Sequence, residues 1–258
     1  MVISNLNFGE CINFSICKRF GIITLNRTHR SNSFTIEQLN FLKKAVEYCQ
    51  HTEKIRGVIL TANGNSFSTG MDLDFIDGSD HDAVKKLEET AAAICQLLFY
   101  GKPSIAAING RCWGEGVVFT LCCDYRIAVR DSFFLMPEIL SGIFPGTGCV
   151  ILMVKQIGIS WTKKMLMFAE RVDTNTALKI GLIDEIIENK EDLLKNSLEK
   201  AKFLFPKNQS FLNAIKICSN HLLDKSYANA YDIEKIGSAW YSYEDKELFL
   251  KLLREKVG

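Results

Sequence analysis

The sequence has 258 residues, of which 47% are hydrophobic, 24% are charged and four are proline. A chain this apolar and this evenly composed folds as a globular protein rather than remaining disordered or forming a fibre. Its 31 basic and 30 acidic side chains leave a formal net charge of +1, so no surface for nucleic acid is indicated.

The cysteines and the N-terminus bear on the cellular compartment. Nine cysteines are spread along the chain without a repeating spacing, which is typical of buried thiols in a reducing compartment. The doublet Cys122 and Cys123 has no matching pair of Cys or His, so we expect no metal site. The N-terminus has no basic segment before an apolar stretch, and no apolar run approaches the roughly 20 residues of a membrane helix. We therefore expect a cytoplasmic protein with no membrane partner.

The first elements in chain order are a hairpin, a helix and a buried strand. Residues 12–26 form two extended runs around a turn at Lys18 and Arg19, which predicts a hairpin. Thr35 and Gln38 form a capping box before apolar residues at helical spacing, which predicts a helix over residues 36–49. Residues 57–61 are apolar on both faces, as in a buried parallel strand.

Strands and helices then alternate. A helix is expected over residues 82–99, a strand over 104–109, a helix after Gly114 and a strand over 125–129. This alternation predicts an α/β fold. From about residue 190 only helical patterns remain. We therefore expect a core over residues 1–190 and a C-terminal helical region over residues 191–258.

Two glycine-containing segments follow buried strands. Residues 64–73 follow the strand at 57–61, and residues 109–118 follow the strand that begins at Ser104. Ligands of α/β proteins bind at such strand ends. Neither segment carries the lysine of a phosphate-binding loop, so both are expected to offer exposed backbone N–H groups.

Five motifs occur in chain order between about residues 12 and 190. They are residues 23–27 (Ile-Thr-Leu-Asn-Arg) with Asn32, residues 67–73 (Phe-Ser-Thr-Gly-Met-Asp-Leu), residues 108–124, residues 136–146 and residues 177–184. Together they resemble the crotonase family, the enoyl-CoA hydratase/isomerase superfamily.

The resemblance implies a fold, a substrate and an assembly. The fold is a spiral of ββα units with a C-terminal helical trimerisation region, and trimers or hexamers are the expected assembly. The substrate is an acyl-CoA thioester, and coenzyme A enters as part of that substrate, with no further cofactor. By position, the N–H groups of Met71 and Glu115 form an oxyanion hole for an enolate.

The resemblance also assigns a base and a set of contacts for the substrate. Glu138, after Pro137, occupies the position of the catalytic glutamate, and its apolar neighbours favour a raised pKa. A solvated loop glutamate is the alternative. His29 and Arg30 are expected to meet the nucleotide part of CoA. The full set of expected substrate contacts is Arg27, His29, Arg30, Ser68, Gly70, Asp72, Leu73, Trp113 and Gly114. Of these, Asp72 is expected mainly to orient its loop, and Trp113 either lines the acyl channel or packs in the core.

Two departures from the family pattern bear on the reaction. Val118 stands where hydratases of the family have a second glutamate, so the site of the added water looks incomplete and isomerisation of a 3-enoyl-CoA is favoured. Glu115 stands where the family usually has glycine. Its side chain either points outward or replaces the carboxylate missing at position 118. The alternatives left open are a hydratase, a dehydratase or decarboxylase of carrier-bound polyketides, and a non-catalytic scaffold that binds acyl-CoA.

Overall fold

The computed structural model describes residues 6–204 and 206–221. Its larger sheet has six strands, all parallel except the N-terminal one. In spatial order they are β1 (Ile12–Cys17), β2 (Phe20–Leu25), β3 (Gly57–Ala62), β5 (Ser104–Ile108), β7 (Tyr125–Val129) and β10 (Glu185–Ile187).

A second, four-stranded sheet is made of short strands. They are β4 (Ser66–Ser68), β6 (Arg111–Trp113), β8 (Phe133–Leu135) and β9 (Val172–Asp173). Strands of two or three residues are too short to show a periodicity, and the sequence did not predict them.

Three successive units each give one strand to each sheet and then a helix. The first is β3, β4, then α2 (Leu73–Asp77) and α3 (His81–Tyr100); the second is β5, β6 and α4 (Glu115–Leu121); the third is β7, β8 and α5 (Cys149–Phe168), which is interrupted at Gly158. The predicted spiral of ββα units is confirmed.

The remaining helices flank these units. They are α1 (Ile36–His51), α6 (Thr174–Lys179), α7 (Leu193–Leu204), α8 (Gln209–His221) and three 3₁₀ helices (Thr28–Arg30, Glu138–Ser141 and Lys190–Asp192).

The predicted N-terminal elements are confirmed. Lys18 and Arg19 turn the β1–β2 hairpin with positive φ angles of 48° and 70°, and the Thr35 side chain accepts a hydrogen bond from the Gln38 N–H at the start of α1. The helix α5 was not predicted.

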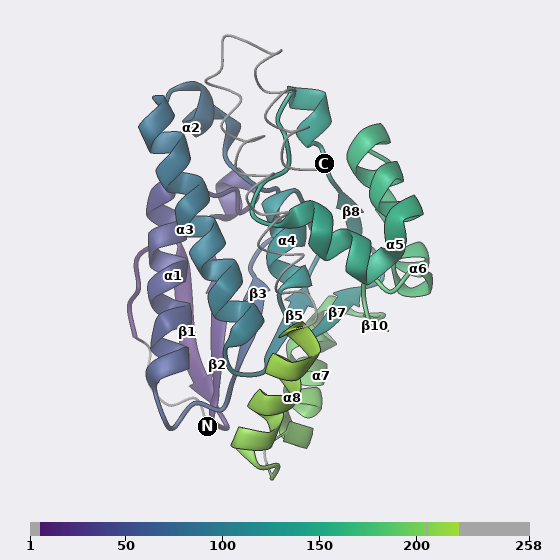
Figure 1. Cartoon of the computed structure of the whole chain (residues 1–258). Coiled ribbons are helices and arrows are strands. Elements are labelled where there is room, and N and C mark those ends of the chain that lie inside the picture. Colours follow the sequence, from purple (N-terminus) through teal and green to yellow (C-terminus); the bar gives the residue numbers. More distant parts are fainter. Residues whose placement is uncertain (1–5, 205, 222–258) are drawn as a thin grey trace.

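Both faces of the six-stranded sheet are covered. Successive side chains of a strand point to opposite faces, so Ile23 joins the core formed with α1 and α3, whereas Ile22 joins a smaller core with Leu193 and Ala201 of α7. Figure 1 shows α1 and α3 side by side, with α7 and α8 below them in the view, and α7 contacts the central strands β3, β5 and β7. The described part of the C-terminal region thus packs on the core. The rest of the expected helical region, residues 222–258, lies outside the described residues.

The sequence led us to expect free thiols, no membrane-spanning helix and no metal site. All nine cysteines are free thiols. Within residues 6–204 and 206–221, no helix is long and apolar enough to cross a bilayer, and no three potential metal ligands cluster.

Candidate active site

A pocket of about 520 Å³ lies where the two glycine-containing segments meet the loop before α5. It gathers most of the residues singled out in the sequence. The predicted site residues that line it are His29, Arg30, Gly70, Met71, Asp72, Leu73, Trp113, Gly114, Glu115 and Glu138. Arg27 and Ser68 do not line the pocket and have other contacts, described below.

The segment around Met71 is held by a bridge to Phe34. The Phe34 N–H donates to the Gly70 carbonyl at 2.8 Å, and the Asp72 N–H donates to the Phe34 carbonyl at 2.9 Å. These two bonds flank Met71 and turn its own N–H to the opposite side of the segment. Within the described part of the chain, the Met71 N–H has no hydrogen-bond acceptor.

The second segment lies directly against the first. Gly70 has a φ of 83°, and a Cβ added to it would stand 3.3 Å from the backbone nitrogen of Glu115 and 3.4 Å from the Cα of Gly114. Glu115 is the first residue of α4, and among the described residues no acceptor meets its N–H either. Two open backbone donors therefore stand on adjacent segments, which is the arrangement an oxyanion hole requires.

Glu138 enters the pocket from the end of β8. Because Trp113 pairs with Leu135 and the Gly114 N–H donates to the Leu135 carbonyl at 3.0 Å, the chain after β8 passes beside Gly114. A Cβ added at Gly114 would stand 2.9 Å from Glu138 Oε1. The Glu138 carboxyl group therefore faces the start of α4.

The surroundings of Glu138 are those of a proton carrier. The residue as a whole is partly exposed, but its Oε2 is buried and has no hydrogen-bond partner in the described residues. Burial raises the pKa of this carboxyl to about 7. The alternative of a solvated loop glutamate is therefore wrong.

The side chain of Glu115 points inward. The residue is 7% exposed, its Oε2 accepts a hydrogen bond from Thr147 Oγ1 at 2.9 Å, and its Oε1 accepts a weak one from Cys95 Sγ at 3.8 Å. Burial raises its pKa to about 8, and the nearby carboxyls of Glu138 and Glu88 add to the rise. The expectation that Glu115 points outward is wrong. Val118, in contrast, is 1% exposed in the core and does not line the pocket.

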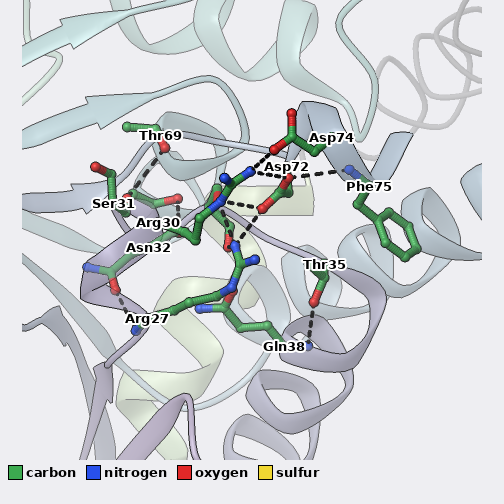
Figure 2. Close-up of polar contacts among 12 residues, drawn as sticks. Arg27, Arg30, Ser31, Asn32, Thr35, Gln38, Thr69, Asp72, Asp74 and Phe75 are labelled. Atoms are coloured by element: carbon green, nitrogen blue, oxygen red, sulfur yellow. Dashed lines mark hydrogen bonds and ion pairs between the residues drawn. The ribbon is translucent and has the colours of Figure 1, made fainter. Parts of the chain in front are cut away.

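Asp72 is the centre of an ion-pair cluster behind the Met71 segment. Figure 2 shows two guanidinium groups directed at its carboxylate: Arg27 Nη1 lies 2.6 Å from Oδ2, and Arg30 Nη2 lies 3.2 Å from Oδ1. Ser33 Oγ donates to Oδ2 at 3.0 Å, and the N–H of Phe75 donates to Oδ1 at 3.3 Å as the cap of α2. Asp72 thus orients its loop, as expected.

The electrostatics of the cluster follow from these contacts. Burial raises the pKa of the Asp72 carboxyl, but the hydrogen bonds from Arg27, Arg30 and Ser33 outweigh burial and hold the pKa at about 2. Arg30 also pairs with Asp74 at the pocket rim. Since its charge is shared between two carboxylates, Arg30 is less available to a phosphate than an unpaired arginine would be.

Arg27 and Ser68, the two predicted site residues that do not line the pocket, form hydrogen bonds to residues beside it. Arg27 donates to Ser33 and Asp72, so its guanidinium is committed within the protein. Ser68 is fully buried; its hydroxyl donates to the Asn32 carbonyl at 2.8 Å and accepts from the Gly70 N–H at 3.1 Å.

At the rim, His29 and Trp113 line the pocket. The Trp113 ring also packs against Phe133, with 5.8 Å between the ring centroids. Both residues are partly exposed and outside the core, and a contact of Trp113 with the acyl chain stays a prediction. Thr147, Glu88 and Cys95 were missed by the sequence analysis. Thr147 lies just past the fourth motif, between two glycines. Only tertiary packing brings Glu88 of α3 to the pocket and Cys95 of α3 against the Glu115 carboxyl.

The sequence is similar to a known protein family and to several named relatives. Residues 16–246 match the family model described as "Enoyl-CoA hydratase/isomerase". A crotonyl-CoA hydratase of Syntrophomonas wolfei is 26% identical and covers 93% of each chain. A probable peroxisomal enoyl-CoA hydratase 1 of Arabidopsis thaliana is 30% identical over 90% of this chain and 86% of its own. Human ethylmalonyl-CoA decarboxylase is 29% identical over 85% of this chain and 74% of its own.

A solved structure supports the fold. An enoyl-CoA hydratase/isomerase from Mycobacterium paratuberculosis superposes with a TM-score of 0.85 at 19% identity, covering 95% of this chain and 99% of its own. The predicted crotonase-like architecture is therefore confirmed.

Proposed function

The chain belongs to the enoyl-CoA hydratase/isomerase family, and on that premise we propose that it isomerises a 3-enoyl-CoA to the conjugated 2-enoyl-CoA. In this proposal Glu138 is the only base, and the N–H groups of Met71 and Glu115 form the oxyanion hole. Coenzyme A enters and leaves as part of the substrate, and the reaction needs no further cofactor.

The mechanism is a proton transfer from C2 to C4. The Glu138 carboxylate takes a proton from C2, and the electron pair of that C–H bond moves towards the thioester carbonyl, whose oxygen becomes negative. The two backbone N–H groups stabilise this oxygen as its charge develops. Glu138 then returns the proton at C4, the double bond lies between C2 and C3, and the enzyme regains its starting protonation state.

One observation carries the proposal: the Glu138 carboxyl lies beside Gly114 in the pocket, and its Oε2 is buried without a hydrogen-bond partner among the described residues. A base that takes a proton and must return it works best when its pKa lies near the working pH. The raised pKa of about 7 satisfies this condition. Near pH 7 both the ionised form, which accepts a proton, and the protonated form are populated.

Other family reactions share the same enolate. The names of the relatives include hydratases and a decarboxylase, so hydration is the second candidate function, favoured by the inward carboxyl of Glu115. A carrier-bound acyl group as substrate, and a scaffold without turnover, are the remaining alternatives. We further propose that His29 and Arg30 at the rim contact CoA, and that the protein assembles as a trimer or hexamer.

Turnover of a 3-enoyl-CoA tests the proposal. The formation of the conjugated thioester is followed by its ultraviolet absorbance. Glu138→Gln is nearly isosteric but cannot accept a proton, so we expect turnover to fall by roughly 100-fold or more while acyl-CoA affinity stays within a few-fold.

Glu89→Gln on the exposed side of α3 removes the same charge outside the pocket and is the matched control. Unchanged turnover in Glu138→Gln would remove Glu138 from the mechanism. A parent protein that binds acyl-CoA without any turnover would favour the scaffold.

A further inference from the structure

We propose that the Glu115 carboxyl is a second proton carrier, which protonates the leaving hydroxyl of a 3-hydroxyacyl thioester so that the pocket eliminates water and, in reverse, adds it to a 2-enoyl thioester. The inference rests on the proposed function for the thioester substrate and its oxyanion hole. It goes beyond that function because isomerisation uses only the backbone N–H of Glu115.

The placement of Glu115 is the first support. Glu115 and Glu138 line the same pocket. The Glu138 carboxyl contributes to the raised pKa of Glu115, and Glu138 Oε1 would stand 2.9 Å from a Cβ added at Gly114, the residue before Glu115. Buried carboxyl groups are costly to keep in a protein, and one that lines a ligand pocket is a candidate for acid–base chemistry. The mechanism derived above leaves this one unused.

The hydrogen bonds of Glu115 suit both of its protonation states. Thr147 Oγ1 lies 2.9 Å from Glu115 Oε2 and 2.8 Å from the carbonyl oxygen of Gly146. When Glu115 is ionised, the hydroxyl donates to it. When Glu115 is protonated, the hydroxyl accepts the carboxyl proton and turns its own proton to Gly146. The proton can thus leave and return without moving a heavy atom or leaving a buried polar group unpaired.

The backbone at Thr147 indicates that this contact is imposed by the fold. Thr147 is 4% exposed and has a φ of 59°, a left-handed conformation that is uncommon for a β-branched residue. Such conformations persist where the surrounding structure fixes them, often at functional sites. Here the conformation accompanies a hydroxyl placed against a buried acid.

Among the described residues, three ionisable groups face Glu115: Glu138 from the 3₁₀ helix after β8, and Glu88 and Cys95 from α3. With pKa values raised to about 8 for Glu115 and about 7 for Glu138, the prevailing state between these values has Glu115 protonated and Glu138 ionised. Two coupled carboxyls in this state hold one proton between them. This is the distribution that elimination of water requires: one base and one acid.

Groups in the pocket account for every proton and electron pair that the elimination moves. The Glu138 carboxylate takes the proton from C2, and the electrons of that bond form the C2–C3 double bond by way of the enolate. The C3–O bond breaks with its electron pair on oxygen, and the departing hydroxide receives the Glu115 proton and leaves as water. Glu138 is then protonated and Glu115 ionised, which is the state that adds water in the reverse direction.

The test compares two reactions in the same full-length chain. A 3-hydroxyacyl-CoA is supplied for dehydration and a 3-enoyl-CoA for isomerisation, and the conjugated product of both is read by absorbance. Glu115→Gln keeps the backbone N–H and the size of the side chain. We expect dehydration to fall by roughly 100-fold or more, a much larger fall than that of isomerisation, which uses the backbone N–H that the variant keeps. Glu89→Gln is the matched control and leaves both rates unchanged.

The pH profile separates a proton carrier from a structural residue. Dehydration by the parent is expected to decline as the pH rises above about 8, because Glu115 must carry a proton, whereas isomerisation shows no such decline. Thr147→Val, which removes the hydroxyl, is expected to lower dehydration more than isomerisation.

Three results would overturn the inference: a parent that isomerises but does not dehydrate, Glu115→Gln that dehydrates at the parent rate, or Glu115→Gln that is folded but loses both reactions equally. A failure of the proposed function is distinct from these, because it is read from 3-enoyl-CoA turnover in Glu138→Gln.

Discussion

The ion-pair cluster at Asp72 is expected to contribute about 2 kcal/mol to the free energy of unfolding. Its pKa of about 2, against an ordinary value of 3.8, means that the folded state favours the ionised form by nearly two pH units, at about 1.4 kcal/mol for each unit. Asp72→Asn removes this contribution but keeps a side-chain oxygen that can cap α2. It also leaves the buried guanidinium of Arg27 without its carboxylate, so about 2 kcal/mol is a lower limit.

The same contribution depends on pH in a defined direction. Because the folded-state pKa lies below the unfolded value, the stabilisation is complete above about pH 4 and is lost as the pH falls from there through about 2. At pH 3 the parent is expected to have lost about 1 kcal/mol of it. The difference in stability between the parent and Asp72→Asn should therefore shrink on acidification.

Urea unfolding at pH 7 and pH 3 measures both effects. Asp74→Asn is the matched control, since this neighbouring carboxylate also pairs with Arg30 but is 78% exposed, and exposed pairs contribute little. A loss below about 1 kcal/mol in Asp72→Asn at pH 7, or a difference that does not shrink at pH 3, would refute the reasoning.

Three further predictions concern the pocket and the assembly. Gly114→Ala is expected to lower turnover by about 100-fold, because its Cβ would stand 2.9 Å from Glu138 Oε1 and its backbone (φ 51°, ψ −126°) lies outside the left-handed helical region. Gly142→Ala (φ 66°, ψ 20°), with no atom within 4 Å, is the control for an alanine at positive φ that meets no neighbour. Isomerisation should fall about tenfold per pH unit below about pH 7, since burial raises the pKa of the Glu138 base, and a flat kcat/KM profile from pH 5 to 7 would contradict it. Light scattering should give the mass of a trimer or hexamer; a monomer with full turnover would count against the assembly.

The sequence predicted the elements whose patterns are long enough to read. The hairpin, α1 and β3 follow from alternation, capping and apolar runs, and the order of five motifs indicated the spiral. The strands of the second sheet were missed because two or three residues carry no periodicity. The twenty-residue helix α5 was also missed, although its apolar positions recur at helical spacing.

The site could be predicted where function depends on the backbone or on a motif. Met71 and Glu138 were placed by their motifs, and the structure brings both to one pocket. The direction of the Glu115 side chain could not be predicted, because it depends on Thr147 and Cys95, which are 32 and 20 residues away in the chain. Arg27 was predicted to contact the substrate because it lies in the first motif. In the structure its guanidinium instead pairs with the Asp72 carboxylate.

The bridge between Phe34 and Met71 has a consequence for how this pocket can change during evolution. The donors it helps to present are main-chain amides, and no substitution except proline removes an amide hydrogen. The side chains at positions 71 and 115 are therefore free to vary without loss of the oxyanion site. A carboxyl group at position 115 is one such variation, and it leaves the main-chain donor of the oxyanion site in place.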